Sequence, residues 1–188
     1  PQGSGSPHAT NTNSLNRINS RPWDVVVLQD QSIIPSIQCS RTAWMFPGAQ
    51  SLAATISAND PSTRVMLYQT WGRRDASSFC LCTDCENFAS YAAMQDELTE
   101  GYDQCAALIG AEVAPVGEAW RIARAADPGL DLYAGDGSHP SREGSYLAAC
   151  VFYREIFDES PVGLAFDAGL DPAVAAFLQV VAASVGNC

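Results

Sequence analysis

The amino-acid sequence predicts one α/β domain, in which a parallel sheet is covered by helices on both faces. Short apolar runs alternate along the chain with longer stretches of helical character. Polar clusters follow these runs, as is typical where loops leave the carboxyl ends of parallel strands. With 188 residues, of which 47% are hydrophobic, the chain is long enough for a core and too apolar for a disordered protein.

The first 21 residues are rich in Ser, Asn, Gly and Pro, and we expect them to form a flexible segment ahead of a domain at residues 22–188. The first predicted strand, residues 24–28, contains three consecutive valines and is expected to be buried on both faces. A helix is predicted over residues 42–57. It ends before Pro61, because the residue before a proline avoids the helical conformation.

The middle of the chain predicts two further strands and one long helix. The second strand covers residues 64–68, and the Cys-rich stretch after it is expected to be a loop. A long helix is predicted over residues 86–109, with Gly110 as its C-terminal stop. The third strand covers residues 112–116, and its proline sits near the strand end, where a missing N–H group does least harm.

The last third of the chain predicts three helices, each with a start or stop signal. Asp127-Pro-Gly129 stops the first, while Ser141 and Asp171 are suitable N-caps for the other two. Residues 131–133 are expected to be short and extended. The three helices are predicted over residues 117–126, 141–157 and 171–185.

The net charge of −11 argues against a nucleic-acid partner, because an acidic surface repels a phosphate backbone. No apolar run approaches the ~18 residues that are needed to cross a bilayer, so no membrane span is expected.

Seven cysteines are many for a chain of this length, and Cys80, Cys82 and Cys85 crowd one short stretch. One interpretation is a zinc site, but structural zinc sites usually show two separated ligand pairs. We favour disulfides, which predict an oxidising compartment: the extracellular space or the lumen of the secretory pathway. The odd count leaves one thiol over, and Cys188 is the natural candidate for a bond to another chain.

Four polar clusters are expected to converge on the carboxyl edge of the sheet, where open α/β sheets bind ligands. They are Gln29-Asp-Gln-Ser32, Gln69-Thr-Trp-Gly72, Gly117-Glu118 and Asp136-Gly-Ser-His139.

The last cluster carries the chemistry of an acid–base pair. A turn between Asp136 and His139 lets the carboxylate reach the inner ring nitrogen, which fixes the tautomer and leaves the outer nitrogen free to act as a base. The alternative is that Asp136 caps a turn and His139 is a loop residue.

Three further side chains are candidates for the same site. Gln31 and Gln29 follow a strand and could donate to a developing oxyanion, or could instead bond neighbouring backbone. Trp71 could form an apolar wall of a substrate pocket, or could belong to the core. His8, in the tail, could line the same cleft.

Several segments together resemble the SGNH/GDSL hydrolase superfamily, over roughly residues 22–183. They are the run from Trp23 to Ser32 with its Leu-Gln-Asp-Gln-Ser, the run from Tyr68 to Trp71, the run from Ala114 to Trp120, and the run from Leu132 to Cys150 with its Asp-Gly-Ser-His-Pro. The resemblance implies a flavodoxin-like three-layer sandwich around a five-stranded parallel sheet. It also implies ester hydrolysis, often carbohydrate deacetylation, with no metal or other cofactor.

By this resemblance, His139 is the general base and Asp136 its orienting partner. Gln31 falls where the family has an oxyanion-hole Asn, and Gln29 is a weaker candidate beside it. The stretch from Gly3 to His8 corresponds to the family's glycine-containing oxyanion block. The family's nucleophile motif, Gly-Asp/Asn-Ser after the first strand, has no counterpart ahead of Trp23, so the first strand of the sheet is missing.

These observations leave two functions open. The first is an SGNH-type esterase acting on an acylated carbohydrate or small ester, with a serine supplied by a missing N-terminal segment or a partner chain that also completes the sheet. The second is a non-catalytic extracellular module that binds carbohydrate or serves as a scaffold. A flavodoxin-like nucleotide binder is disfavoured, because no Gly-rich phosphate loop follows any strand.

Overall fold

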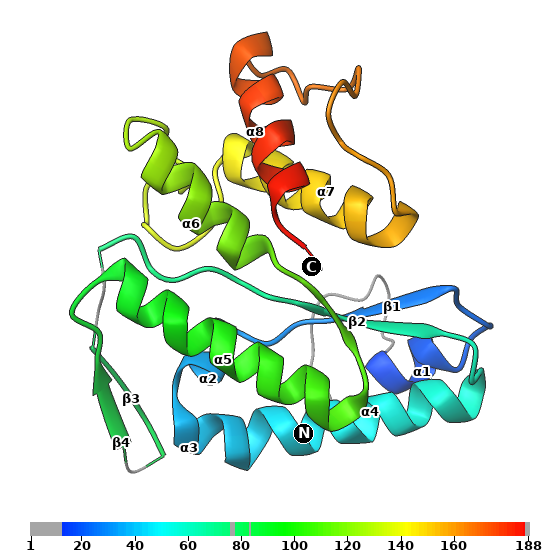
Figure 1. Cartoon of the computed structure of the whole chain (residues 1–188). Coiled ribbons are helices and arrows are strands. Elements are labelled where there is room, and N and C mark those ends of the chain that lie inside the picture. The colour runs from blue at the N-terminus through cyan, green and yellow to red at the C-terminus, as the bar shows by residue number, and fades with distance from the viewer. Residues whose placement is uncertain (1–12, 76–77, 83, 187–188) are drawn as a thin grey trace.

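A computed structural model describes residues 13–75, 78–82 and 84–186. The chain forms the predicted α/β fold, with a parallel sheet between two layers of helices (Figure 1). The sheet has the order β1-β2-β5, and both pairs of neighbours are parallel. Its strands are β1 (Val25–Leu28), β2 (Arg64–Tyr68) and β5 (Glu112–Ala114). All three predicted strands are present, but the third is two residues shorter than predicted, because Val116 already belongs to the next helix.

The central strand β2 divides the core into two halves. Successive side chains of a strand point to opposite faces, so Met66 and Leu67, both almost fully buried, belong to different clusters. Met66 packs on the side that also holds Trp120 and Leu147, whereas Leu67 packs on the side of Leu98. In Figure 1 the side of Met66 is covered by α6, α7 and α8, and the side of Leu67 is covered by α4 and α5.

On the α5 side, α4 (Phe46–Asn59) follows a π-helical turn, η1 (Arg41–Met45), so the helix predicted from residue 42 is irregular at its start. The long helix α5 (Tyr91–Ile109) ends as predicted, at Gly110 with a φ of 65°. Its predicted start at residue 86 was wrong. Ser90 caps the helix instead, because its side chain accepts a hydrogen bond of 3.1 Å from the N–H of Ala93.

The Cys-rich stretch is a hairpin, so the loop predicted there was wrong. Strands β3 (Ser78–Leu81) and β4 (Asp84–Asn87) pair antiparallel. Cys80 lies directly opposite Cys85, and the two form a disulfide, which supports the disulfide interpretation for this pair. In the part of the chain that the structure describes, no group of three His, Cys, Asp or Glu side chains is placed to hold a metal ion. Cys188 lies outside the described residues.

The other face of the sheet is covered by α6 (Val116–Ala126), α7 (Arg142–Phe157) and α8 (Pro172–Ser184). Both predicted N-caps are present. The Ser141 hydroxyl accepts from the N–H of Gly144 at 3.1 Å, and the Asp171 carboxylate accepts from the N–H of Ala173 at 2.8 Å. These caps satisfy N–H groups that a helix start leaves unpaired.

The described end of the N-terminal segment, residues 13–21, contains a short helix. Helix α1 (Ser14–Ile18) is capped by Asn13, which accepts from the N–H of Asn16 at 2.9 Å. It contacts α4 and buries Ile18. Burial of one apolar side chain and a cap were enough to override the polar composition. The stretch from Gly3 to His8 lies outside the described residues.

Two short helices, α2 (Ile33–Ser36) and α3 (Gln38–Ser40), connect β1 to η1. No helix in the described ranges combines the length and apolar character of a membrane span.

Candidate active site

The segment that holds Asp136 and His139 is a tight loop between α6 and α7. The N–H of Ala134 donates to the carbonyl of His139 at 2.8 Å, and Tyr133 forms a bridge with Pro140. Gly137 sits at the turn with a φ of 65°, a conformation that a residue without a Cβ adopts at little cost. These contacts lie within residues 133–140, so the loop is held in shape by its own backbone.

The two predicted acid–base residues lie in contact. Asp136 Oδ2 lies 2.5 Å from His139 Nδ1, while its Oδ1 accepts 2.9 Å bonds from the N–H groups of Ser138 and His139. The side-chain bond to His139, followed by these backbone bonds, holds the pKa of the Asp136 carboxyl well below its usual range. The loop therefore presents an ionised carboxylate to one ring nitrogen.

The imidazole of His139 is otherwise open to its surroundings, with a side chain 78% exposed. Since Nδ1 is occupied by Asp136, the nitrogen available to an incoming ligand is Nε2. This is the arrangement that a general base needs, because the carboxylate orients the ring and the outer nitrogen accepts the proton.

Trp71 does not form the wall of an open pocket, because its side chain is buried. It stacks on Trp120, with ring centroids 4.0 Å apart and an angle of 2° between the planes. Its Nε1–H donates to the carbonyl of Ser138 at 2.9 Å. Trp71 thus belongs to the core, and it supports the loop of Asp136 and His139 through its bond to Ser138 instead of lining an open pocket.

Sequence reasoning missed two aromatic residues that support the same loop. Trp120 packs edge-on against Tyr133 at 4.7 Å, and the Tyr133 hydroxyl donates to the carbonyl of Gly72 at 2.7 Å. A Cβ on Gly144 would come within 2.5 Å of the Trp120 ring. The stack therefore joins the loop to α6 and α7, and a glycine is required where α7 crosses it.

The end of β1 carries the predicted oxyanion residues. Gln31 accepts a bond from the N–H of Ile33 at 2.9 Å through its amide oxygen, as the backbone interpretation predicted. Its NH₂ group, the part that would donate to an oxyanion, has no partner among the described residues. Gln29 is exposed on the same loop. Figure 1 places this end of β1 and the α6–α7 connection on the side where the strands end.

The other two polar clusters are structural. Gln69, which is almost fully buried, accepts from the N–H of Glu118 at 3.1 Å through its side chain. Its carbonyl accepts from the N–H of Gly117 at 3.1 Å. Both bonds satisfy N–H groups that the start of α6 would otherwise leave unpaired.

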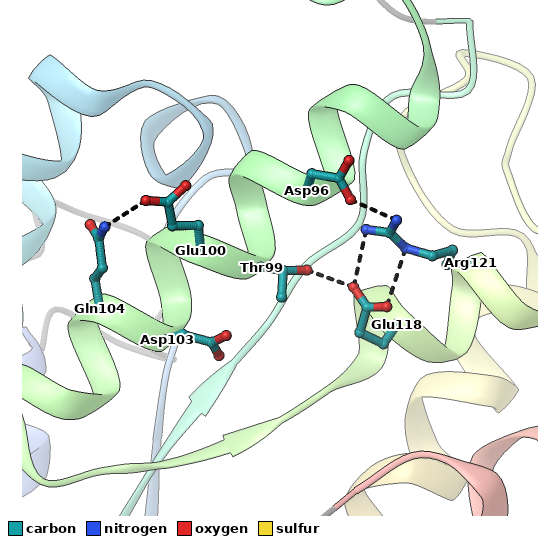
Figure 2. Close-up of a pocket in the computed structure, with 7 residues that line it drawn as sticks. All are labelled: Asp96, Thr99, Glu100, Asp103, Gln104, Glu118 and Arg121. Carbon is teal, nitrogen blue, oxygen red and sulfur yellow. Dashed lines mark hydrogen bonds and ion pairs between the residues drawn. The ribbon is translucent and has the colours of Figure 1, made fainter.

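A pocket of about 480 Å³ between α5 and α6 is lined by Glu118 of the predicted polar clusters, but by none of the predicted catalytic, oxyanion or substrate-binding residues (Figure 2). Arg121 pairs there with Asp96 at 2.7 Å and with Glu118 at 3.2 Å. Thr99 donates to Glu118 at 2.6 Å. Figure 2 shows these groups turned toward one another, so they satisfy each other instead of presenting a nucleophile or base.

Comparison with known proteins gives the fold. No protein-family model and no curated protein matches the chain. A DUF4886 family protein from Bacteroides uniformis ATCC 8492 superposes with a TM-score of 0.75 at 20% identity, over 91% of this chain. The chain spans 65% of the length of that protein.

A second structure, described as "a putative SGNH hydrolase" from Slackia heliotrinireducens, matches with a TM-score of 0.55 and 28% identity. The match covers 73% of this chain and 67% of that one. The chain therefore has an SGNH-like α/β fold, in agreement with the fold that its motifs resemble.

Proposed function

We propose that this chain carries the base and oxyanion part of an SGNH-type carboxylic-ester hydrolase that acts on an acylated carbohydrate. The observation that carries the proposal is the contact of 2.5 Å between Asp136 and His139, with the outer face of the imidazole exposed. The loop that carries the two residues lies on the side where the parallel strands end, and sheets of this type bind ligands on that side.

In the proposed reaction, Nε2 of His139 removes the proton of a serine hydroxyl while the serine oxygen attacks the acyl carbon. The carboxylate of Asp136 stabilises the imidazolium that forms. The NH₂ group of Gln31, with Gln29 as a further candidate, and backbone N–H groups hold the oxyanion. The imidazolium then protonates the leaving sugar oxygen, and a water repeats the two proton transfers to release the acid.

The proposed serine comes from a segment outside the described residues, in this protein or in a partner chain. The support for it is the open side of β1, which has a neighbour only at β2 within the described sheet. Val25 and Val27 point to the same face, yet Val27 is 40% exposed whereas Val25 packs against the core. An additional strand beside β1 would pair the unpaired backbone groups of its open edge, and the side chains of that strand would pack beside Val27.

Serine labelling of the native protein tests the proposal. A fluorophosphonate probe is expected to modify one serine, and mass spectrometry of the labelled peptide identifies its chain and position. Hydrolysis of 4-nitrophenyl acetate is expected to fall by about 10³-fold or more in His139→Ala, because the serine loses its base. Glu100→Gln, on the exposed face of α5, is the control. An unlabelled protein, or a fully active His139→Ala variant, would refute the proposal.

A second function is favoured by one observation. Within the described residues, no hydroxyl group contacts the ring of His139, whose side-chain partner there is Asp136. A non-catalytic module that binds carbohydrate or serves as a scaffold would show this arrangement in its native assembly as well. Binding of an acetylated oligosaccharide without release of acetate would support this function over the esterase.

We also propose an extracellular or secretory-pathway location. The disulfide between Cys80 and Cys85 supports it, because such bonds persist in oxidising compartments.

A further inference from the structure

A second pocket, of about 330 Å³, lies against the loop that carries Asp136 and His139. Its walls include Arg74, Arg124, Asp131 and Tyr133. The N–H of Arg74 donates to the carbonyl of Gly137 at 3.0 Å, and the Arg74 side chain lies about 3.5 Å from where a Cβ of Gly137 would be. The pocket therefore touches the active-site loop at the residue next to Asp136.

Arg124 is the group in this pocket that lacks an ionic partner. Its guanidinium lies 4.2 Å from the centre of the Tyr91 ring and 5.1 Å from that of Tyr133. Its polar contacts with the described residues are a long bond of 3.4 Å to the carbonyl of Arg74 and a contact with the hydroxyl of Tyr133, and neither partner is a carboxylate. These rings fix the guanidinium in place but leave most of its N–H donors unused.

Arg74 is paired with two carboxylates. Its guanidinium contacts Asp131, which lines the pocket, at 3.1 Å and Asp75, which is largely exposed outside the pocket, at 3.4 Å. The one positive charge of the pocket without a carboxylate partner among the described residues is therefore that of Arg124. In a protein with a net charge of −11, this charge is held in place by the contacts of Arg124 with its two rings.

We propose that this pocket, the Arg124 pocket, binds the carboxylate of an acidic sugar. As a statement about the substrate, this rests on the proposed esterase function and makes the substrate an acylated, carboxylate-bearing carbohydrate. A guanidinium donates two parallel bonds to a planar carboxylate, and a single unpaired charge matches a monoanion better than a phosphate dianion.

Binding of matched ligands tests the proposal without any need for turnover. Glucuronate and its neutral analogue glucuronamide are titrated into the full chain, with calorimetry or NMR as the readout. Glucuronate is expected to bind about tenfold more tightly, the effect of a charge-assisted hydrogen bond. Equal affinities for the two ligands would overturn the proposal, as would tighter binding of inorganic phosphate than of glucuronate.

Variants test whether the preference for glucuronate depends on Arg124. Arg124→Gln is expected to abolish the preference for glucuronate. Arg21→Gln is the matched control, because Arg21 also lies over an aromatic ring, at 3.9 Å from the centre of Trp23, but outside the pocket. Asp131→Asn removes the lining carboxylate and is expected to raise glucuronate affinity about threefold, a gain that misfolding would not produce. A preference that survives in Arg124→Gln would refute the assignment.

The two proposals fail separately. Hydrolysis of neutral 4-nitrophenyl acetate by the native protein reports on the esterase alone, whereas the glucuronate titration reports on the Arg124 pocket alone. Hydrolysis without a preference for glucuronate would overturn only the acidic-sugar site, and the reverse result would overturn only the esterase.

Discussion

The carboxylate of Asp136 accepts three hydrogen bonds from its own loop, one from the ring of His139 and two from backbone N–H groups. All three favour the charged form, which is why its pKa is lowered although the group is exposed. The carboxylate thus has two roles, because the bonds that shape the turn also hold the ring of His139. The turn therefore holds the contact between Asp136 and His139 by bonds made within the loop itself.

At the residue scale, we predict that Asp136 remains ionised below the pH at which an ordinary aspartate is protonated. A carboxyl with a lowered folded pKa contributes stability that is fully present above its unfolded pKa, and this contribution is lost as pH falls through the folded value. An NMR titration of the Asp136 side-chain carbon is expected to show a midpoint below 3.8.

The same titration in His139→Ala is expected to move the midpoint up toward 3.8, because the bond to His139 is the largest cause of the shift. The backbone bonds from Ser138 and residue 139 remain and keep part of the effect. A midpoint at or above 3.8 in the native protein, or an unchanged midpoint in the variant, would contradict the role given to this contact.

At the element scale, the α6–α7 connection rests on a layer of aromatic rings that the chain assembles from distant segments. Trp71 follows β2, Trp120 lies on α6 and Tyr133 opens the loop itself. The layer can form only if α7 approaches closely. Gly144 permits this, since a Cβ there would meet both the Trp120 ring at 2.5 Å and the carbonyl of Leu132 at 2.3 Å.

Gly144→Ala is predicted to destabilise the protein by about 1–3 kcal/mol, because an added methyl group in a packed core forces backbone and rings apart. Denaturant unfolding measures the change. Gly135→Ala is the matched control, since nothing lies within 4 Å of a Cβ at that position. A loss of stability as large in Gly135→Ala as in Gly144→Ala would mean that the aromatic layer is not the cause.

Signals contained within one segment were readable from the sequence. The caps at Ser141 and Asp171, the stop at Gly110 and the three strands follow from local patterns, and the structure has them. The β3–β4 hairpin was missed because few apolar residues alternate in it and its two strands are held by a cross-strand disulfide.

Features that depend on distant partners were ambiguous. Trp71 was compatible with a pocket wall or with the core, and only its stacking on Trp120 decides between them. Arg124 gave no signal at all, because its two aromatic neighbours come from other parts of the chain. The contact between Asp136 and His139 was readable because both residues lie in one turn.

At the scale of the whole molecule, the described sheet has two edge strands, β1 and β5. Strand β2 is covered on both faces and paired on both sides, whereas β1 is paired within the described residues only to β2. Its Val27 is exposed although all four residues of the strand are apolar. A β-branched apolar strand with an open edge invites pairing with another segment, and the chain spans only 65% of the length of the DUF4886 structure that it resembles.

We predict that Val27→Asp leaves the stability of the chain unchanged but prevents a further strand from pairing with β1. In the chain alone the side chain at this position is already exposed, so the free energy of unfolding is expected to change by about 1 kcal/mol or less. Where a further strand covers β1, the same carboxylate would be buried without a partner, and association with that segment is expected to be lost together with ester hydrolysis. Size-exclusion chromatography and 4-nitrophenyl acetate turnover of the native assembly measure both effects. Val180→Asp, at a more exposed valine on α8, is expected to change neither, and an assembly that tolerates Val27→Asp would show that β1 stays an open edge.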